Sequence, residues 1–484
     1  MDKVSRFLML VILFVSQFKT IYSQNQEVLD IGNRREIFID YYLIEKLSNV
    51  SLKMNTPYPG ECVLKFDKPW EGKYSGYVTL IKDGELFRLY YRGLPTSGKD
   101  GSNIEVTCYA ESTDGVNFVK PNLGIYNIMG TNDNNVILAN DPPFSHNFAP
   151  FIDTKPGIPS KEKYKAIAGT SESGLYTFVS EDGIHWHKSS NGPILKGYEF
   201  DSQNVAFWSE VENKYVLYFR TWNGPNNQFR WISRTTSKDF IHWDSPITMD
   251  KGDAPWEHIY TNQTIPYFRT PHIYISLCAR FVPDCNALSE EEIHSINVEN
   301  KYAHDCSDVI LMTSRGGNLY NRTFLEAFLK PEIGLENWVS RTNYPVRGIV
   351  QINDSEMAFY IQKHYALPTA HIKRYILRLD GFSSLSAGSE EGHVYTKPIK
   401  FSGKNLYLNF ATSAVGYIQI EIQDINGNSI PPFSLDNFIT LKGNRIEKIA
   451  EWKGVSDLGS LEGKPIKIHF KMKDAEIYSI KFNR

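Results

Sequence analysis

A five-fold repeat of one strand–turn–strand pattern constrains the fold more than any other feature of the sequence. Each copy joins a strand-like run to a Ser- or Arg-rich approach, a turn and a second aromatic or apolar run. In the first two copies the turn is Asp-Gly, which supplies the positive φ that a tight hairpin needs. The copies recur every roughly 55 to 80 residues, near the upper end of propeller-type periods. They span residues 109–118, 178–186, 233–243, 312–320 and 377–385.

Further strand-like runs precede these turns, as at residues 87–91 and 215–219. Each repeat therefore predicts four antiparallel strands, the composition of a propeller blade. We expect an all-β chain with no helical domain, built on a five-bladed β-propeller. The expected blades span residues 65–125, 140–190, 195–246, 250–326 and 332–388.

The C-terminal part predicts a second β domain. Residues 406–410, 417–422, 465–470 and 477–482 alternate apolar and polar side chains, as half-buried strands do. We expect a propeller over residues 25–390 and a β-sandwich over residues 391–484. Residues 36–44 form a lead-in strand that could close the propeller ring.

The first 24 residues are typical of a signal peptide. Lys3 and Arg6 precede an apolar run at residues 7–15, and a polar stretch follows it. This run is too short to span a bilayer. We expect a secreted or periplasmic protein with no membrane insertion after removal of the signal.

Charge and composition narrow the choice of partner. The net charge is −3, and no basic stripe suggests nucleic-acid binding. The 28 Tyr, 28 Phe and 9 Trp favour strands, and exposed rings could also stack on sugars. Neither C-x-x-C nor His-x-x-x-His spacing occurs, so we expect no metal and no cofactor. The expected partner is a carbohydrate, and the oligomeric state stays open.

Five segments carry a resemblance to a known family: residues 37–45, 200–208, 260–269, 374–382 and 471–479. With them the chain resembles uncharacterised bacterial proteins labelled glycoside hydrolase family 32-like. It lacks the Asn-Asp-Pro-Asn-Gly and Arg-Asp-Pro segments of family 32 itself. The resemblance therefore implies a propeller that acts on carbohydrate, and no fructan chemistry.

Polar residues stand where each expected blade opens. The innermost strands of a propeller line one channel, so we expect these side chains to meet at one funnel mouth. The substrate-binding candidates are Trp70, Glu71, His146, Asn147, Gln203, Asn204, His258, Asn262, Arg269 and Arg347.

Hydrolysis of a glycosidic bond needs two carboxyl groups, one protonated and one ionised. Asp201 and Glu257 open adjacent blades and form our predicted pair. The amides after Asp201 would keep it ionised, and Trp256 could raise the pKa of Glu257 for the acid role. Asp40 is a third catalytic candidate, because furanosidase-like propellers place a nucleophile near the first strand.

Other interpretations stay open for these residues. The acids could serve turns or solvated loops, and Arg269 and Arg280 could bind an acidic sugar or form structural ion pairs with Asp. We predict a secreted glycoside hydrolase. A non-catalytic carbohydrate-binding propeller is the alternative, and a structural or partner-binding propeller fits the funnel acids less well.

Overall fold

The computed structural model describes residues 27–483, so the expected signal segment at residues 1–24 lies outside the described residues. The described chain is built of strands, which confirms the all-β prediction. No helix within residues 27–483 has the length and apolar character needed to cross a membrane. The helical elements are α2 (Glu290–Ser295), α3 (Asn300–Ala303) and the 3-10 turns η1 (Ser160–Glu162), η2 (Pro225–Asn227), η3 (Leu335–Asn337), η4 (Leu435–Asn437) and η5 (Gly459–Leu461).

Strand pairing divides most of residues 58–378 into five antiparallel units, counted over the described chain. The first three units each contain four consecutive strands. Unit one contains β6 (Gly76–Asp83), β7 (Leu86–Gly93), β8 (Val106–Ser112) and β9 (Val136–Leu138). Unit two contains β10 (Ala149–Ile152), β11 (Tyr164–Thr170), β12 (Gly174–Ser180) and β13 (His187–Lys188). Unit three contains β14 (Val205–Ser209), β15 (Lys214–Asn223), β16 (Phe229–Ser237) and β17 (Ile247–Thr248).

The last two units depart from this order. In unit four, two short strands pair in turn with one long strand, and in unit five the outermost strand comes from the N-terminal part of the chain. Unit four contains β18 (His258–Thr261), β19 (Ile265–Tyr267), β20 (Thr270–Val282) and β21 (Cys306–Ser314). Unit five contains β22 (Tyr344–Gln351), β23 (Glu356–Lys363), β24 (His371–Arg378) and β5 (Tyr58–Lys65).

The first strands of units one, two, three and five, together with β19 of unit four, contact one another in the cyclic order β6, β10, β14, β19, β22 and back to β6. Because β18 and β19 pair with the same strand β20, we count the two together as the first strand of unit four. Strand β22 meets β6 in parallel, with Arg347 opposite Thr79. Strand β5 lies antiparallel to β24 and completes unit five. The cycle is therefore closed at two levels, by the β22–β6 contact inside and by β5 outside.

The repeated turns of the first three units share one hydrogen-bond pattern. In unit one, the Asp114 carboxylate accepts from the Val116 and Asn117 backbone N–H groups, and the Gly115 N–H donates to the Ser112 hydroxyl. Backbone N–H groups and the Ser112 hydroxyl lower the pKa of Asp114 below its usual value. Residues 180–185 and 237–242 repeat these contacts, with Phe240 at φ 72° where the other two copies have glycine.

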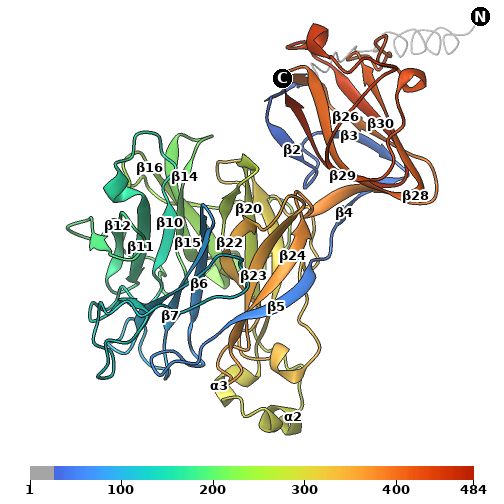
Figure 1. Ribbon diagram of the computed structural model, residues 1–484. Helices are drawn as coiled ribbons and strands as arrows, with labels where there is room; N and C mark the ends of the chain where they lie inside the picture. The colour runs from blue at the N-terminus through green and yellow to red at the C-terminus, as the bar shows by residue number, and fades with distance from the viewer. Residues whose placement is uncertain (1–26, 484) are drawn as a thin grey trace, which may run out of the picture.

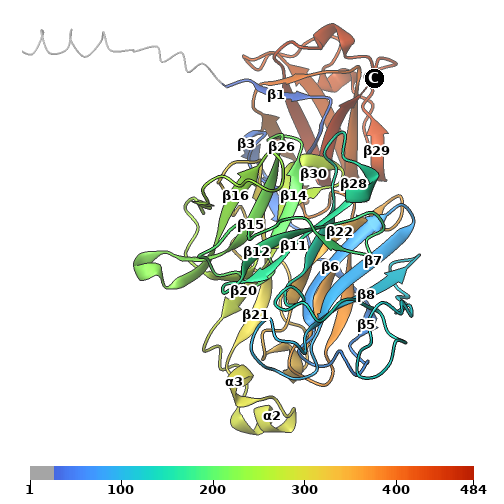
Figure 2. The same cartoon turned by 90° about the vertical axis from the view of Figure 1, so that its left-hand side faces the viewer.

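A further eight-stranded sheet and the separate parallel pair of β1 with β27 gather both ends of the described chain (Figures 1 and 2). The longest strands of the eight-stranded sheet, β28 and β30, pair with each other along most of their length. The N-terminal strands are β1 (Leu29–Gly32), β2 (Arg35–Ile37), β3 (Ile44–Ser48) and β4 (Val50–Met54). The C-terminal strands are β25 (Ser383–Ala387), β26 (Gly392–Thr396), β27 (Ile399–Phe401), β28 (Asn405–Gln423), β29 (Asn444–Ile449) and β30 (Lys467–Asn483).

This pairing differs from the expected division of the chain at residue 390. Strands β2, β3 and β4 pair with β30, β26 and β25, and β1 pairs with β27, so residues 29–54 lie with the C-terminal strands. The expected lead-in strand at residues 36–44 therefore does not close the ring, and β5 does so in its place. We use the name C-terminal sheet for this eight-stranded sheet together with the pair of β1 and β27.

A buried ionic cluster joins the C-terminal sheet to units four and five. Asp380 is 1% exposed and lies 3.5 Å from Arg35 and 3.2 Å from Arg269. The hydroxyls of Tyr267 and Ser479 donate to the same carboxylate. One acid thus accepts from strands of the ring and of the C-terminal sheet at once.

We predict that Asp380→Ala destabilises the protein, because it removes the buried anion shared by Arg35 and Arg269 and leaves them only the half-exposed Glu447. Breaking a buried ion pair from one side costs about 3–5 kcal/mol. Scanning calorimetry should show a fall in Tm of roughly 5 °C or more. Glu172→Ala is the control, since Glu172 pairs with Lys99 on the surface, where both side chains are over 75% exposed. Equal Tm values for the two variants would contradict the role of Asp380.

Candidate functional site at the polar end of the ring

The two ends of the first strands differ in chemistry. A cavity of 660 Å³ lies at their C-terminal ends, and apolar side chains such as Phe151, Phe207 and Trp208 line it. Its charged lining residues are Lys82, Glu210 and Arg347. A cavity with a single carboxylate cannot supply the acid pair that glycoside hydrolysis needs. The candidate site is therefore the other end.

The N-terminal ends of the first strands form a polar end. A small cavity of 20 Å³ lies there. Helices α2 and α3 lie at this end, on the side away from the C-terminal sheet (Figure 1). Two contacts hold the insertion that carries them. Lys73 donates to Glu299 at 2.8 Å, and the Tyr302 ring packs against the Tyr74 ring. The cavity is lined by Gly76, Tyr77, Arg92, Tyr260, Arg341, Tyr344, Gln362 and Tyr365.

Tyrosine hydroxyls dominate this cavity. Burial raises the pKa of Tyr77, Tyr344 and Tyr365 well above the usual value for tyrosine. These phenols stay neutral at physiological pH and remain able to donate hydrogen bonds. The Tyr77 hydroxyl already donates to the Asp201 carbonyl oxygen at 2.9 Å.

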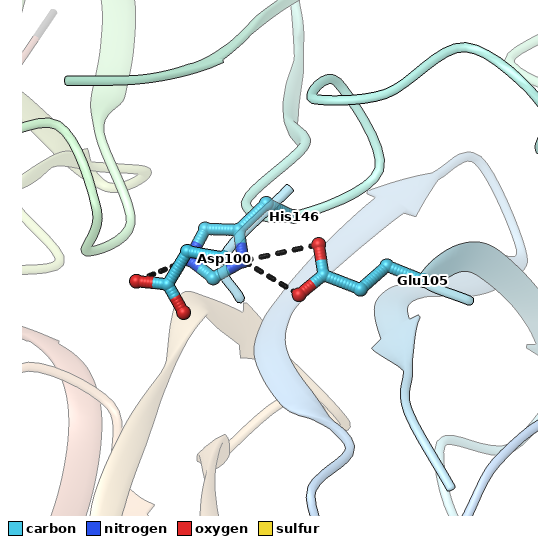
Figure 3. Close-up of side chains that lie close together, drawn as sticks. All are labelled: Asp100, Glu105 and His146. Atoms are coloured by element: carbon cyan, nitrogen blue, oxygen red, sulfur yellow. Dashed lines mark hydrogen bonds and ion pairs between the residues drawn. The ribbon is translucent and has the colours of Figure 1, made fainter. Parts of the chain in front are cut away.

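His146 lies at the centre of a polar cluster at this end (Figure 3). Its Nδ1 is 3.0 Å from Glu105 and 3.2 Å from Arg92. Its Nε2 is 2.9 Å from the Asp201 carbonyl oxygen and 3.8 Å from the Asp100 carboxylate. A carbonyl only accepts, so Nε2 carries the proton that it donates to Asp201.

Asp100, Glu105 and His146 have ligand atoms within 4.8 Å of one another, which is close enough for a metal ion. Two observations oppose this interpretation. The Arg92 guanidinium is already next to Nδ1, and Nε2 is the protonated donor to Asp201. A cation would have to displace one positive charge and one proton, so these residues do not fit a metal.

Two amides hold the loop that carries Asp201. The Asn147 side chain donates to the carbonyl oxygens of Phe200 and Ser202, and Asn204 donates to the same two oxygens. The Asp201 carboxylate accepts from Arg220 at 2.5 Å and keeps 28% of its side chain exposed. Asn147 and Asn204 are therefore positioning residues for an accessible acid.

Gln203 and Arg347 fill the interior of the ring. Gln203 donates to the Thr79 hydroxyl and accepts from Gln263, whose amide also donates to the Pro345 carbonyl. Arg347 donates to the carbonyl oxygens of Pro150 and Ala206, and burial lowers its pKa to about 10. These hydrogen bonds connect neighbouring first strands below the polar end.

Trp70 and Glu71 pack inside unit one. Glu71 is fully buried and accepts from Tyr91 and Lys120, while the Trp70 indole donates to Asn135. Every polar atom named here has a partner within the unit. Both residues therefore have a structural explanation.

Glu257 lies between arginines other than the one that pairs with Asp201. Its carboxylate accepts from Arg280 at 2.7 Å and from Arg322 at 2.5 Å. Arg280 also pairs with Asp308. No hydrogen bond or ion pair within the described part of the chain links Glu257 to Asp201, and their pairing stays a prediction.

Each of the remaining candidate residues has hydrogen-bond or ion-pair partners outside the cluster around His146. Asp40 accepts from Arg315, and Arg269 pairs with Asp380 and Glu447, so both lie against the C-terminal sheet. Asn262 accepts from the Thr264 N–H in the turn between β18 and β19. His258 lies close to the polar end, where its Nδ1 accepts from the Arg230 N–H.

Sequence reasoning missed Arg92 and Arg220 of this end, because it considered only residues that open the first strands. Arg92 and Arg220 lie near the C-terminal ends of the second strands β7 and β15. A second strand runs antiparallel to the first, so its end returns to the mouth where the first begins. Charged residues at the C-terminal ends of the second strands could therefore have indicated these two arginines from the sequence.

Comparisons with known proteins give distant structural matches. No family model matches the chain, and no curated protein matches it. A β-1,2-mannobiose phosphorylase from Listeria innocua superposes with TM-score 0.42 at 10% identity, covering 68% of this chain and 98% of that one. A glycosyl hydrolase from Bacteroides ovatus gives TM-score 0.40 at 16% identity, covering 69% and 96%. An N-acetylgalactosamine deacetylase from F. plautii gives 0.41 at 13% identity, covering 69% and 97%.

We predict that Asn147→Ala loosens the Asp201 loop. The change removes two hydrogen bonds and leaves the Gly169 N–H without its acceptor. An unsatisfied buried group costs about 1–3 kcal/mol. Thermal unfolding followed by circular dichroism should give a lower Tm than for Asn318→Ala, an exposed asparagine. A Tm equal to that of the Asn318 variant would show that Asn204 alone holds the loop.

Proposed function

We propose that the closed cycle of five units is a five-bladed β-propeller, that the C-terminal sheet forms a β-sandwich, and that the protein is a secreted glycoside hydrolase. The cyclic contacts of the first strands support the propeller. The observation that carries the function is that Asp201, through its backbone carbonyl, and Asp100, through its carboxylate, both lie next to His146. The Asp201 backbone and the Asp100 carboxylate both face Nε2 of that ring.

In this proposal Asp201 and Asp100 divide the two tasks of glycoside hydrolysis. Asp201, held as an anion by Arg220, attacks the anomeric carbon or activates a water that does so. Asp100, in its carboxylic acid form, donates its proton to the leaving oxygen and regains a proton from the attacking water or from solvent. The tyrosine hydroxyls of the polar end hold the sugar hydroxyls.

Glu257 remains the other candidate for the second carboxylate. Both of its oxygens already accept from arginines, whereas within residues 27–483 Asp100 forms one ion pair, with His146 at 3.8 Å. Asp100 is therefore freer to approach a glycosidic oxygen. We rank it above Glu257 and include both in the test.

A carbohydrate-binding protein without catalysis is the second candidate function. The tight ion pair between Asp201 and Arg220 favours it, because a carboxylate held at 2.5 Å is less free to react. Binding sites and active sites of this kind use the same residue types. Turnover measurements separate the two.

The test compares Asp201→Asn, Asp100→Asn and Glu257→Gln on a panel of oligosaccharides, with release of new reducing ends as the measurement. We expect Asp201→Asn and Asp100→Asn each to lower kcat by at least about 100-fold, since removal of an acid or base costs 10²–10⁴-fold. Glu257→Gln should retain most activity. Asp354→Asn, on an exposed loop, is the matched control.

Each outcome decides one point. Loss in Glu257→Gln with a fully active Asp100→Asn would assign the second role to Glu257. Full activity in all three variants would refute a carboxylate mechanism at this end. Binding of an oligosaccharide without any release of reducing ends would establish the non-catalytic alternative.

A further inference from the structure

Three guanidinium groups surround one aromatic ring at the polar end. The Tyr260 ring centroid is 5.5 Å from the guanidinium carbon of Arg220, and 5.6 Å from those of Arg230 and Arg341. Arg220 and Arg230 come from unit three, Tyr260 from unit four, and Arg341 from the segment before unit five. Three positive charges are thus concentrated where three units meet.

Two of these arginines have acids of their own, and the third has none. Arg220 pairs with Asp201, and Arg341 pairs with Asp305 at 3.3 Å. Across residues 27–483, the Arg230 guanidinium makes no hydrogen bond and no ion pair, and its Nε is buried without a partner. Burial and the neighbouring Arg220 and Arg341 lower the pKa of Arg230.

Aromatic rings position the Arg230 guanidinium without using its N–H groups. Its central carbon lies 4.9 Å from the Trp222 ring and 5.0 Å from the Phe281 ring. Cation–π contacts of this kind attract the charge and leave the planar fork free. That fork matches a carboxylate or a sulfate in a bidentate arrangement.

A half-buried cation between two other cations is costly unless an anion joins it. We propose that Arg230, flanked by Arg220 and Arg341, binds the carboxylate or sulfate of an acidic saccharide. The exposed face of Trp222, which is 39% accessible, receives the adjoining sugar ring. This inference rests on the proposed carbohydrate function and adds the class of substrate: a glycan that carries uronate or sulfate groups.

The site differs from the arginine pair that the sequence suggested. Arg269 and Arg280 each form ion pairs with two acids. The partners are Asp380 and Glu447 for Arg269, and Asp308 and Glu257 for Arg280. Neither has a free fork for a ligand. The acidic-sugar interpretation therefore moves to Arg230.

The experiment measures binding by calorimetric titration with four probes. Oligogalacturonate and its fully methyl-esterified form test the carboxylate, and sulfated and unsulfated dextran oligosaccharides test the sulfate. We expect an acidic probe to bind at least about tenfold more tightly than its neutral partner, because a charge-assisted hydrogen bond contributes at least that much. Affinity should fall as salt is raised, since salt screens the interaction.

Arg230→Met should abolish this preference, Arg230→Lys should keep part of it, and Arg445→Met, on an exposed strand of the C-terminal sheet, should leave it unchanged. Tm values of all variants identify any that fail to fold, and Arg230→Lys then serves alone. Equal binding of acidic and neutral probes, or an unchanged preference in Arg230→Met and Arg230→Lys, would overturn the proposal.

The outcome is separable from that of the proposed function. Release of reducing ends from neutral probes only would support the hydrolase and overturn the acidic substrate. Selective binding of an acidic probe without release would support the Arg230 site and contradict the hydrolase.

Discussion

Asp380 is the group through which the ring and the C-terminal sheet act as one body. A carboxylate that is 1% exposed needs compensation from every side, and it receives this from Arg35 of β2, from Arg269 and Tyr267 of unit four and from Ser479 of β30. Arg35 and Arg269 also share Glu447 of β29. Separation of the two parts would break the contacts of Arg269 with Glu447 and of Arg35 with Asp380.

A second cluster of ion pairs also joins the ring to the C-terminal sheet. Arg315, directly after β21, contacts Glu36 at 2.9 Å and Asp40 at 3.1 Å, and His272 lies 2.8 Å from Glu36. Arg315 and Asp380 occupy the fourth and fifth copies of the repeated turn. The copies that lack the Ser–Asp pattern of the first three are thus the ones that face the C-terminal sheet, and their charged residues hold the interface.

The local part of the fold could be predicted from the sequence. The Ser112–Asp114–Gly115 turn and its two relatives form from residues close in the chain, so their pattern indicates hairpins correctly. The partner of residues 36–44 could not be predicted, because Glu36 pairs with Ile480 across most of the chain. Long-range pairing depends on the whole fold, and no local pattern records it.

The candidate site was predicted in part for a similar reason. Asp201, His146 and Asn147 do meet at the polar end, because they open first strands that begin side by side. Glu71 also precedes a first strand, yet its side chain turns back to Tyr91 and Lys120 in its own unit. The direction of a side chain before a strand depends on packing. For the same reason the sequence did not indicate Arg92 and Arg220, which lie near the C-terminal ends of the second strands β7 and β15.

The pairing of the chain's two ends sets the order in which the molecule can be completed. During synthesis β1–β5 emerge first, but β5 pairs with β24 and β2 pairs with β30, the final strand. Units one to three contain only their own consecutive strands and can form as they leave the ribosome. The earliest strands must wait, with unpaired edges, for the latest ones. A chain released before β30 is complete would retain finished central units and lack the sheet that holds both of its ends.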